Sequence, residues 1–139
     1  MTIPTQTAQT GGNFVVMVVD DDEMQVAYIS ALLTSLGVTN TMTASSGADA
    51  IAQIENAATK PDLLICDLLM PGMDGFDMMA ELSTKKLFMP IIIMSAQTAQ
   101  VRKSAEIVGK IKFFDVLGTV EKPVELSALK ALLEKVKPA

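Results

Sequence analysis

The chain has 139 residues, half of them hydrophobic, and its 16 acidic and 11 basic side chains give a net charge of −5. This length is typical of one domain with its own core, and the acidic balance argues against direct nucleic-acid binding. The absence of histidine excludes a Ser-His-Asp triad and a histidine zinc site, and the single cysteine, Cys66, cannot form an internal disulfide.

Residues 1–12 are polar and rich in Thr and Gln, so we predict a flexible N-terminal tail followed by one domain over residues 13–139. The tail lacks the basic start and the apolar stretch of a secretion signal. No apolar run in the chain approaches the length of a membrane span. We therefore expect a cytoplasmic protein that makes no contact with a membrane.

The first half of the chain alternates between strand-like and helix-like segments. In order, the pattern predicts a strand over 14–20, a helix over 23–36, a strand over 38–44 and a helix over 46–57. The first helix places its apolar residues on one face: Val26, Ile29, Leu33 and Leu36. Gly37 ends this helix, and Ser46 is the expected cap of the next one.

The second half continues the alternation. In order, the pattern predicts a strand over 62–66, a helix over 76–84, a strand over 91–94, a helix over 97–109, a strand over 115–120 and a helix over 124–137. The buried face of the last helix is predicted from Leu126, Leu129, Leu133 and Val136. Five β–α units with short connections favour an α/β fold with a parallel sheet between layers of helices.

Polar side chains follow four of these strands. The first strand ends in Asp20 and Asp21, and the others are followed by Asp67, Ser95 and Lys122. Because ligands bind at the carboxyl ends of parallel strands, these groups can converge at one edge of the sheet. Carboxylates that lie close together repel one another unless a cation or a lysine offsets their charge. The pattern therefore predicts a cation site there.

Four short motifs carry a family resemblance. They are Val18-Val19-Asp20-Asp21-Asp22, Cys66-Asp67-Leu68-Leu69-Met70-Pro71-Gly72-Met73-Asp74-Gly75, Met94-Ser95-Ala96 and Glu121-Lys122-Pro123. In this order and spacing, over residues 14–136, the chain resembles the receiver domain of two-component response regulators. The resemblance implies a flavodoxin-like, doubly wound, five-stranded parallel sheet of order 2-1-3-4-5 with five helices in three layers.

The resemblance also implies a role for each residue at the strand ends. Asp67 would be the phosphoacceptor, since a carboxylate can act as a nucleophile and give an aspartyl phosphate. Lys122 and the Ser95 hydroxyl would contact the phosphoryl oxygens. The implied ligands of a Mg²⁺ ion are Asp20, largely through water, Asp21, Asp67 and the backbone carbonyl of Leu69. The Lys122-Pro123 bond is usually cis in the family.

Partners follow from the same resemblance. With no histidine of its own, the chain would receive its phosphoryl group from a sensor histidine kinase or a histidine phosphotransfer protein. Output would pass through the face formed by the fourth helix, fifth strand and fifth helix. It would reach a separate protein, a second copy of the chain or an effector domain of a longer regulator. A run from Val116 to Pro123 is similar to receivers that precede cyclic-di-GMP phosphodiesterase domains.

Some positions depart from the family pattern or have a plainer reading. Thr119 stands where the family usually has an aromatic ring, so we expect altered coupling between phosphorylation and output. Leu69 and Gln97 occupy two positions that set the lifetime of the phosphoryl group in the family. Asp22 is interpreted as the cap of the first helix, and Cys66 as a small core residue facing away from Asp67.

Two other functions fit parts of the sequence. Asp20-Asp21-Asp22 after an apolar strand also suits a Mg²⁺-dependent phosphohydrolase of the haloacid dehalogenase type. That family usually has Thr where this chain has Met24, and the chain leaves no room for a cap domain. A degenerate receiver used only for protein binding is the remaining alternative, and the complete set of acids, hydroxyl and lysine argues against it.

Overall fold

The five strand segments predicted from the sequence form one parallel sheet in the order β2-β1-β3-β4-β5. The computed structural model describes residues 14–136. The strands are β1 (Val15–Val19), β2 (Asn40–Ala44), β3 (Leu63–Asp67), β4 (Ile91–Ser95) and β5 (Val116–Glu121). The helices are α2 (Glu23–Ser35), α3 (Gly47–Asn56), α4 (Gly75–Thr84), α5 (Ala99–Ile111) and α6 (Leu126–Leu133). This confirms the predicted doubly wound, flavodoxin-like fold.

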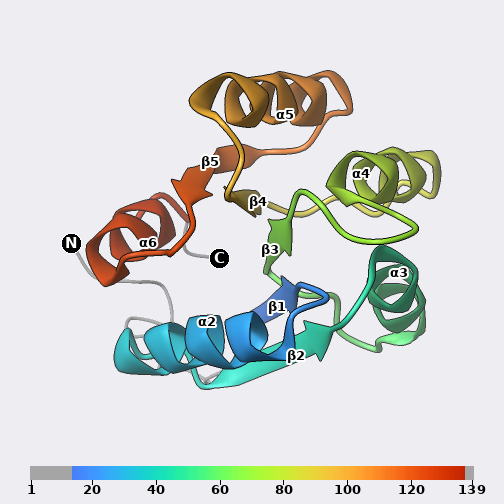
Figure 1. Cartoon of the computed structure of the whole chain (residues 1–139). Coiled ribbons are helices and arrows are strands. Elements are labelled where there is room, and N and C mark those ends of the chain that lie inside the picture. The colour runs from blue at the N-terminus through green and yellow to red at the C-terminus, as the bar shows by residue number, and fades with distance from the viewer. Residues whose placement is uncertain (1–13, 137–139) are drawn as a thin grey trace.

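The sheet lies between two layers of helices (Figure 1), with α2 and α6 on one face and α3, α4 and α5 on the other. Every residue of β3 and β4 is buried, which is why these strands read as unbroken apolar runs rather than alternating ones. Each face of the sheet has its own hydrophobic cluster. Among the helices of residues 14–136, none combines the length and apolarity that a membrane crossing requires.

Helix starts follow the capping residues of the sequence. The Asp22 side chain accepts a hydrogen bond from the Met24 N–H, and Ser46 Oγ accepts one from the Asp49 N–H, which confirms both predicted caps. At the start of α4, Asp74 and Asp77 form a reciprocal capping box. Gly37, at φ 91°, follows α2 as predicted.

The prediction that Leu126 is buried was wrong, because its side chain is 42% exposed. The buried stripe of α6 consists of Leu129, Leu132 and Leu133, and Val136 continues it. Leu132 thus takes the place assigned to Leu126, which lies in the first helical turn at the margin of that stripe. The helix spans Leu126–Leu133 rather than 124–137. The predicted tail, residues 1–12, and the predicted helix end at residue 137 lie outside the described residues.

An irregularity in β5 determines which residues face α5. Ile91 pairs with Val116 and Ile92 with Gly118, so Leu117 is left out of the register as in a β-bulge. Gly118 has φ 157°, and a Cβ at this position would approach Leu132 Cδ2 to 2.7 Å, so a side chain would collide with α6. Beyond the bulge, Val120 packs on the α2 and α6 side. Thr119, and Glu121 with it, therefore face the α5 side.

Candidate phosphoryl-transfer site

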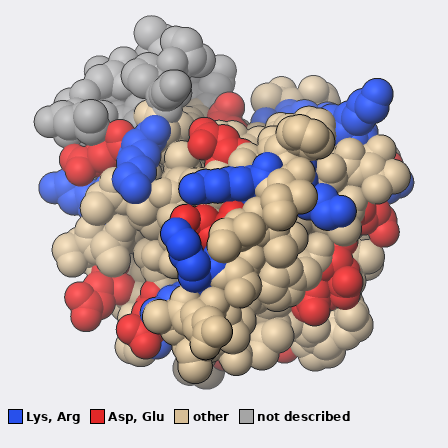
Figure 2. Space-filling model, turned by 90° about the horizontal axis from the view of Figure 1, so that it is seen from above, with Lys and Arg blue, Asp and Glu red and all other residues tan. Residues whose placement is uncertain are grey.

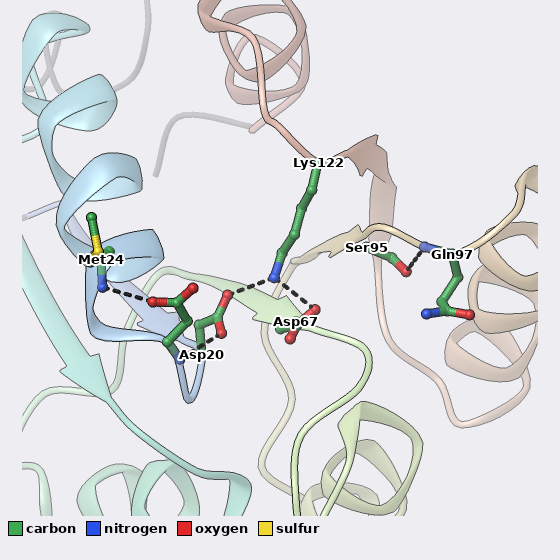
Figure 3. Close-up of polar contacts among 7 residues, drawn as sticks. Asp20, Met24, Asp67, Ser95, Gln97 and Lys122 are labelled. Atoms are coloured by element: carbon green, nitrogen blue, oxygen red, sulfur yellow. Dashed lines mark hydrogen bonds and ion pairs between the residues drawn. The ribbon is translucent and has the colours of Figure 1, made fainter.

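The carboxyl ends of the strands bring the predicted acids and the lysine together (Figure 3). Asp67 is the last residue of β3, Asp20 directly follows β1, and Lys122 directly follows β5. Asp20 is 1% exposed and Asp67 7%. These residues converge because their strands are parallel and their ends form one edge of the sheet. These three side chains therefore lie together at the carboxyl edge of the sheet.

Lys122 joins two acids that are 47 residues apart in the chain. Its Nζ donates to Asp20 Oδ2 at 2.8 Å and lies 3.2 Å from Asp67 Oδ1. The other oxygen of Asp20, Oδ1, accepts a hydrogen bond from the Asp22 N–H at 3.0 Å. Both oxygens of Asp20 are thus engaged by the protein. A buried carboxylate needs such partners, because burial of an unpaired charge is costly.

For both Asp67 and Lys122, burial and the charge of the other residue shift the pKa in opposite directions. Burial raises the pKa of the Asp67 carboxyl, the charge of Lys122 offsets part of the rise, and the charge of Asp20 adds to it. Burial on its own would lower the pKa of Lys122, but its hydrogen bond to Asp20 and the charges of Asp67 and Asp20 more than compensate, and the pKa is raised. Lys122 is consequently a stable cation between two acids.

Three carboxylates can hold a hard cation. Oxygen atoms of Asp20, Asp21 and Asp67 all lie within 4.8 Å of one another, and Asp21 is exposed while the other two are buried. Oxygen donors that leave room for water suit Mg²⁺, so the donor set fits the expected ion. Leu69 lies in the loop after β3, and its side chain is 51% exposed.

Ser95 is part of this edge, but its hydroxyl is bound to the adjacent loop. Ser95 is 1% exposed, and its Oγ accepts a hydrogen bond from the Gln97 N–H at 2.9 Å (Figure 3). Its backbone carbonyl accepts a hydrogen bond from the Lys122 N–H at 3.0 Å. The structure thus brings Asp20, Asp21, Asp67 and Lys122 together and places the Ser95 side chain beside them, directed toward the loop.

The loops around the site show three further features. The Lys122-Pro123 peptide bond is cis, as predicted. The Gly75 N–H donates to the Leu68 carbonyl at 2.8 Å, and a Cβ on Gly75 would lie 3.0 Å from the Asp67 carbonyl oxygen. Glycine at the start of α4 therefore lets this helix pack directly against the backbone that carries Asp67. In the sequence, Gly75 was recognised only as the last residue of the motif that begins at Cys66.

Cys66 lies on the strand beside Asp67, and its side chain is fully buried. Burial, with a smaller contribution from the charge of Asp67, raises the pKa of the thiol to about 12. A thiol that stays protonated is a poor nucleophile and a poor metal ligand. The interpretation of Cys66 as a core residue is confirmed.

Arg102, a residue of α5 that was not recognised from the sequence, has a side chain that is 15% exposed. Its guanidinium donates to the Gln97 carbonyl, in the same loop that binds the Ser95 hydroxyl. Helical periodicity cannot distinguish an arginine of this kind from a solvated one, because both lie at the edge of the apolar face.

Comparison with known proteins agrees with this geometry. The family model of the response regulator receiver domain matches residues 16–134. The autoinducer 1 sensor kinase/phosphatase LuxN of Vibrio campbellii is 31% identical over 118 residues, which cover 85% of this chain and 13% of that protein. The transcriptional regulatory protein ZraR of Escherichia coli is 32% identical over 126 residues, covering 91% of this chain and 27% of that protein. The chain thus spans a small part of the length of these two relatives.

Solved structures share the fold. A chain of the CheX-CheY-BeF3-Mg+2 complex from Borrelia burgdorferi matches with a TM-score of 0.76 and 25% identity, covering 88% of each chain. A DNA-binding response regulator of the LuxR family from Staphylococcus aureus matches with a TM-score of 0.73 and 25% identity, covering 88% of this chain and 98% of that one. The chain belongs to the response regulator receiver domain family of two-component signalling.

Proposed function

We propose that the chain is a Mg²⁺-dependent phosphoacceptor switch in which Asp67 accepts a phosphoryl group. The proposal rests on the residues that surround Asp67. It lies at a strand end, with oxygen atoms of Asp20 and Asp21 within 4.8 Å and Lys122 Nζ 3.2 Å from its Oδ1. This arrangement places a nucleophile between a cation site and a fixed positive charge, which suits transfer of a group with spread negative charge.

In the proposed step, a carboxylate oxygen of Asp67 attacks phosphorus in line with the bond to the donor. The O–P bond forms as the bond between phosphorus and the donor nitrogen or oxygen breaks, and the donor leaves with the electron pair. A bound Mg²⁺, held by Asp21 and Asp67 with Asp20 largely through water and the Leu69 carbonyl, would neutralise charge on the phosphoryl oxygens. Both Asp20 oxygens already have protein partners, which supports a water-mediated role.

Two side chains would change partners when the phosphoryl group arrives. Lys122 Nζ, now paired with Asp20 and Asp67, would donate to a phosphoryl oxygen as a point charge. The Ser95 hydroxyl would leave the Gln97 N–H and donate to another phosphoryl oxygen. The new partners lie at the same sheet edge, so neither change requires the strands to rearrange.

The donor and the output complete the proposal. A sensor histidine kinase or a histidine phosphotransfer protein would supply the phosphoryl group, since the chain has no histidine. Similarity to a sensor kinase and to transcriptional regulators supports such partners. Output would pass through the α5, β5 and α6 face to a protein partner, an effector domain or a second copy of the chain, and we expect a cytoplasmic location.

The experiment is intact-mass analysis after incubation with Mg²⁺ and acetyl phosphate. We expect a single phosphoryl adduct that disappears in Asp67→Asn and on chelation of Mg²⁺. Asp115→Asn is the matched control, since this exposed acid lies at the amino-terminal ends of the strands, opposite to Asp67. There its backbone carbonyl accepts a hydrogen bond from the N–H of Ile91, the first residue of β4. Loss of the adduct in both variants would show that the assay does not report on the site.

The same assay separates the two alternatives. A phosphohydrolase would release inorganic phosphate through Asp20 and would lose activity in Asp20→Asn while Asp67→Asn stays active. Asp20 is 1% exposed with both oxygens engaged, which disfavours it as a nucleophile. A degenerate receiver would form no adduct with acetyl phosphate, phosphoramidate or a phosphorylated histidine donor.

A further inference from the structure

Arg102 differs from the other basic residues of α5. Its side chain is 15% exposed, whereas the side chains of Lys103 and Lys110 are 68% and 60% exposed and share Glu106 as their partner. Figure 2 views the molecule from the side on which α5 lies in Figure 1 and shows basic and acidic side chains next to one another on this surface. A largely buried guanidinium needs hydrogen-bond or ion-pair partners, because burial removes most of the water that would otherwise hydrate its charge. Its partners therefore indicate what it does.

The first partner of Arg102 belongs to the loop that carries Ser95. The guanidinium donates to the Gln97 carbonyl, while the N–H of the same residue donates to Ser95 Oγ at 2.9 Å. Gln97 is thus held on one side by a residue of β4 and on the other by a residue of α5. Any movement of the Ser95 hydroxyl changes one of these two contacts of Gln97.

The second partner lies at the end of β5. The Arg102 guanidinium is 3.9 Å from Glu121 Oε2, and Glu121 directly precedes Lys122, whose N–H donates to the Ser95 carbonyl. Glu121 is 71% exposed, so the ion pair contributes little to stability. Its significance is geometric, because the ion pair links the helix that contains Arg102 to the last residue of β5, directly before Lys122.

The neighbourhood of Glu121 holds no bulky side chain on β5. Thr119 faces the same side of the strand as Glu121, and it is short and half-buried. The planar guanidinium has several donors in a fixed geometry and can bind a carbonyl and a carboxylate at once. Arg102 is therefore equipped to connect the Ser95 loop, α5 and β5 at a position where the strand offers only a hydroxyl and a methyl group.

We propose that Arg102 is a positioning residue that couples the Ser95 hydroxyl to α5 and the end of β5. The inference rests on the proposed phosphoacceptor function. When the hydroxyl leaves the Gln97 N–H for a phosphoryl oxygen, the Gln97 carbonyl keeps its hydrogen bond to Arg102. Gln97 and the Arg102 side chain then move together. The displacement then reaches α5, on which Arg102 lies, and β5 through Glu121. Phosphorylation is thereby communicated without an aromatic ring at position 119.

The test measures amide hydrogen exchange of the full chain with Mg²⁺, with and without beryllofluoride, a mimic of the phosphoryl group. In the unsubstituted protein we expect the mimic to change exchange in the loop 96–98, in α5 and at the end of β5. In Arg102→Ala the mimic should still bind and still change the loop, whereas the changes in α5 and β5 are lost. Lys103→Ala is the matched control, since it removes the same charge from the same helix and should respond like the unsubstituted protein.

Two further variants keep the test decisive if Arg102→Ala does not fold. Arg102→Lys keeps the apolar stem and one donor group but not the planar fork, and Glu121→Gln changes only an exposed carboxylate. We expect both to weaken the β5 response, and the double variant to be no worse than either single one, because both remove the same link. Unchanged responses in Arg102→Lys and Glu121→Gln would overturn the inference.

The outcomes also separate this inference from the function on which it rests. Failure of the unsubstituted protein to bind beryllofluoride and to form an adduct would refute the phosphoacceptor function. If the mimic binds and Arg102→Ala shows the full response in α5 and β5, the phosphoacceptor function stands and the coupling role of Arg102 is wrong. If Arg102→Ala only lowers the melting temperature equally with and without the mimic, Arg102 is merely structural.

Discussion

Replacement of Lys122 by methionine should destabilise the metal-free protein and make its stability depend strongly on Mg²⁺. Methionine keeps most of the apolar stem but removes the ammonium group that lies 2.8 Å from Asp20 and 3.2 Å from Asp67. The side chains of the two acids are only 1% and 9% exposed. Without the lysine, two buried carboxylates face each other with no positive charge between them.

The magnitude follows from this burial. Removal of one partner of a buried ion pair costs about 3–5 kcal/mol. Since the Lys122 side chain is itself 19% exposed and water can relax around the site, we expect the lower limit, about 3 kcal/mol. For a domain of this size, such a loss lowers the melting temperature by roughly 10 °C.

Mg²⁺ should reverse most of this loss, because the ion supplies the missing positive charge. At a concentration 100 times its dissociation constant, a ligand that binds only the folded state adds about 2.7 kcal/mol. In the unsubstituted protein the ion must compete with Lys122 for the same acids, so its stabilising effect should be smaller.

The assay is thermal unfolding of both proteins over a Mg²⁺ titration, with Lys103→Met as the control for loss of an exposed lysine. The reasoning would be refuted by a Lys122→Met protein that melts at the unsubstituted temperature without metal. It would also be refuted by equal Mg²⁺ stabilisation of the two proteins, since Lys122 would then not compete with the ion for the acids of the proposed metal site.

Three further predictions concern Asp67 and two residues beside it. Cys66, with its pKa raised to about 12 by burial, should resist thiol reagents at pH 8 in the folded protein and react once urea unfolds it. Because the pKa of Asp67 is raised, its contribution to stability is present when the carboxyl is protonated and is lost as pH rises through the folded-state pKa. In urea titrations, Asp67→Asn should therefore gain stability relative to the unsubstituted protein between acid and neutral pH. A difference in unfolding free energy that stays constant with pH would contradict the burial argument. Gly75→Ala would bring a Cβ to 3.0 Å from the Asp67 carbonyl oxygen, and we expect about 1–2 kcal/mol of destabilisation with slower adduct formation, measured by denaturation and by time-resolved intact mass; an unchanged adduct rate would show that this contact does not position Asp67.

The parts of the fold that could be predicted are those that depend on patterns of neighbouring residues in the sequence. The strands were identified because β3 and β4 are buried on both faces and therefore appear as unbroken apolar runs. The meeting of Asp20, Asp67 and Lys122 followed because parallel strands end at one edge. Helix starts at Asp22 and Ser46 followed from side chains that satisfy the first free N–H groups.

The features that escaped prediction depend on contacts between distant segments. Leu126 fits the helical repeat, yet it is exposed because the buried stripe of α6 is centred on Leu129 and Leu132. The need for glycine at position 118 arises from the approach of Leu132, which belongs to another element. The hydrogen-bond acceptor of the Arg102 guanidinium is the backbone carbonyl of Gln97, and a backbone group cannot be recognised from residue types.

The central claim, that Asp67 is the phosphoacceptor, is tested most directly by locating the acyl phosphate. Borohydride reduction of the protein after incubation with acetyl phosphate and Mg²⁺ converts a phosphorylated aspartate to homoserine, which peptide mass spectrometry can assign to a position. We predict homoserine at position 67 alone, and only when Mg²⁺ was present. Homoserine at position 20 or 21, or a phosphoryl adduct that gives no homoserine, would contradict the claim.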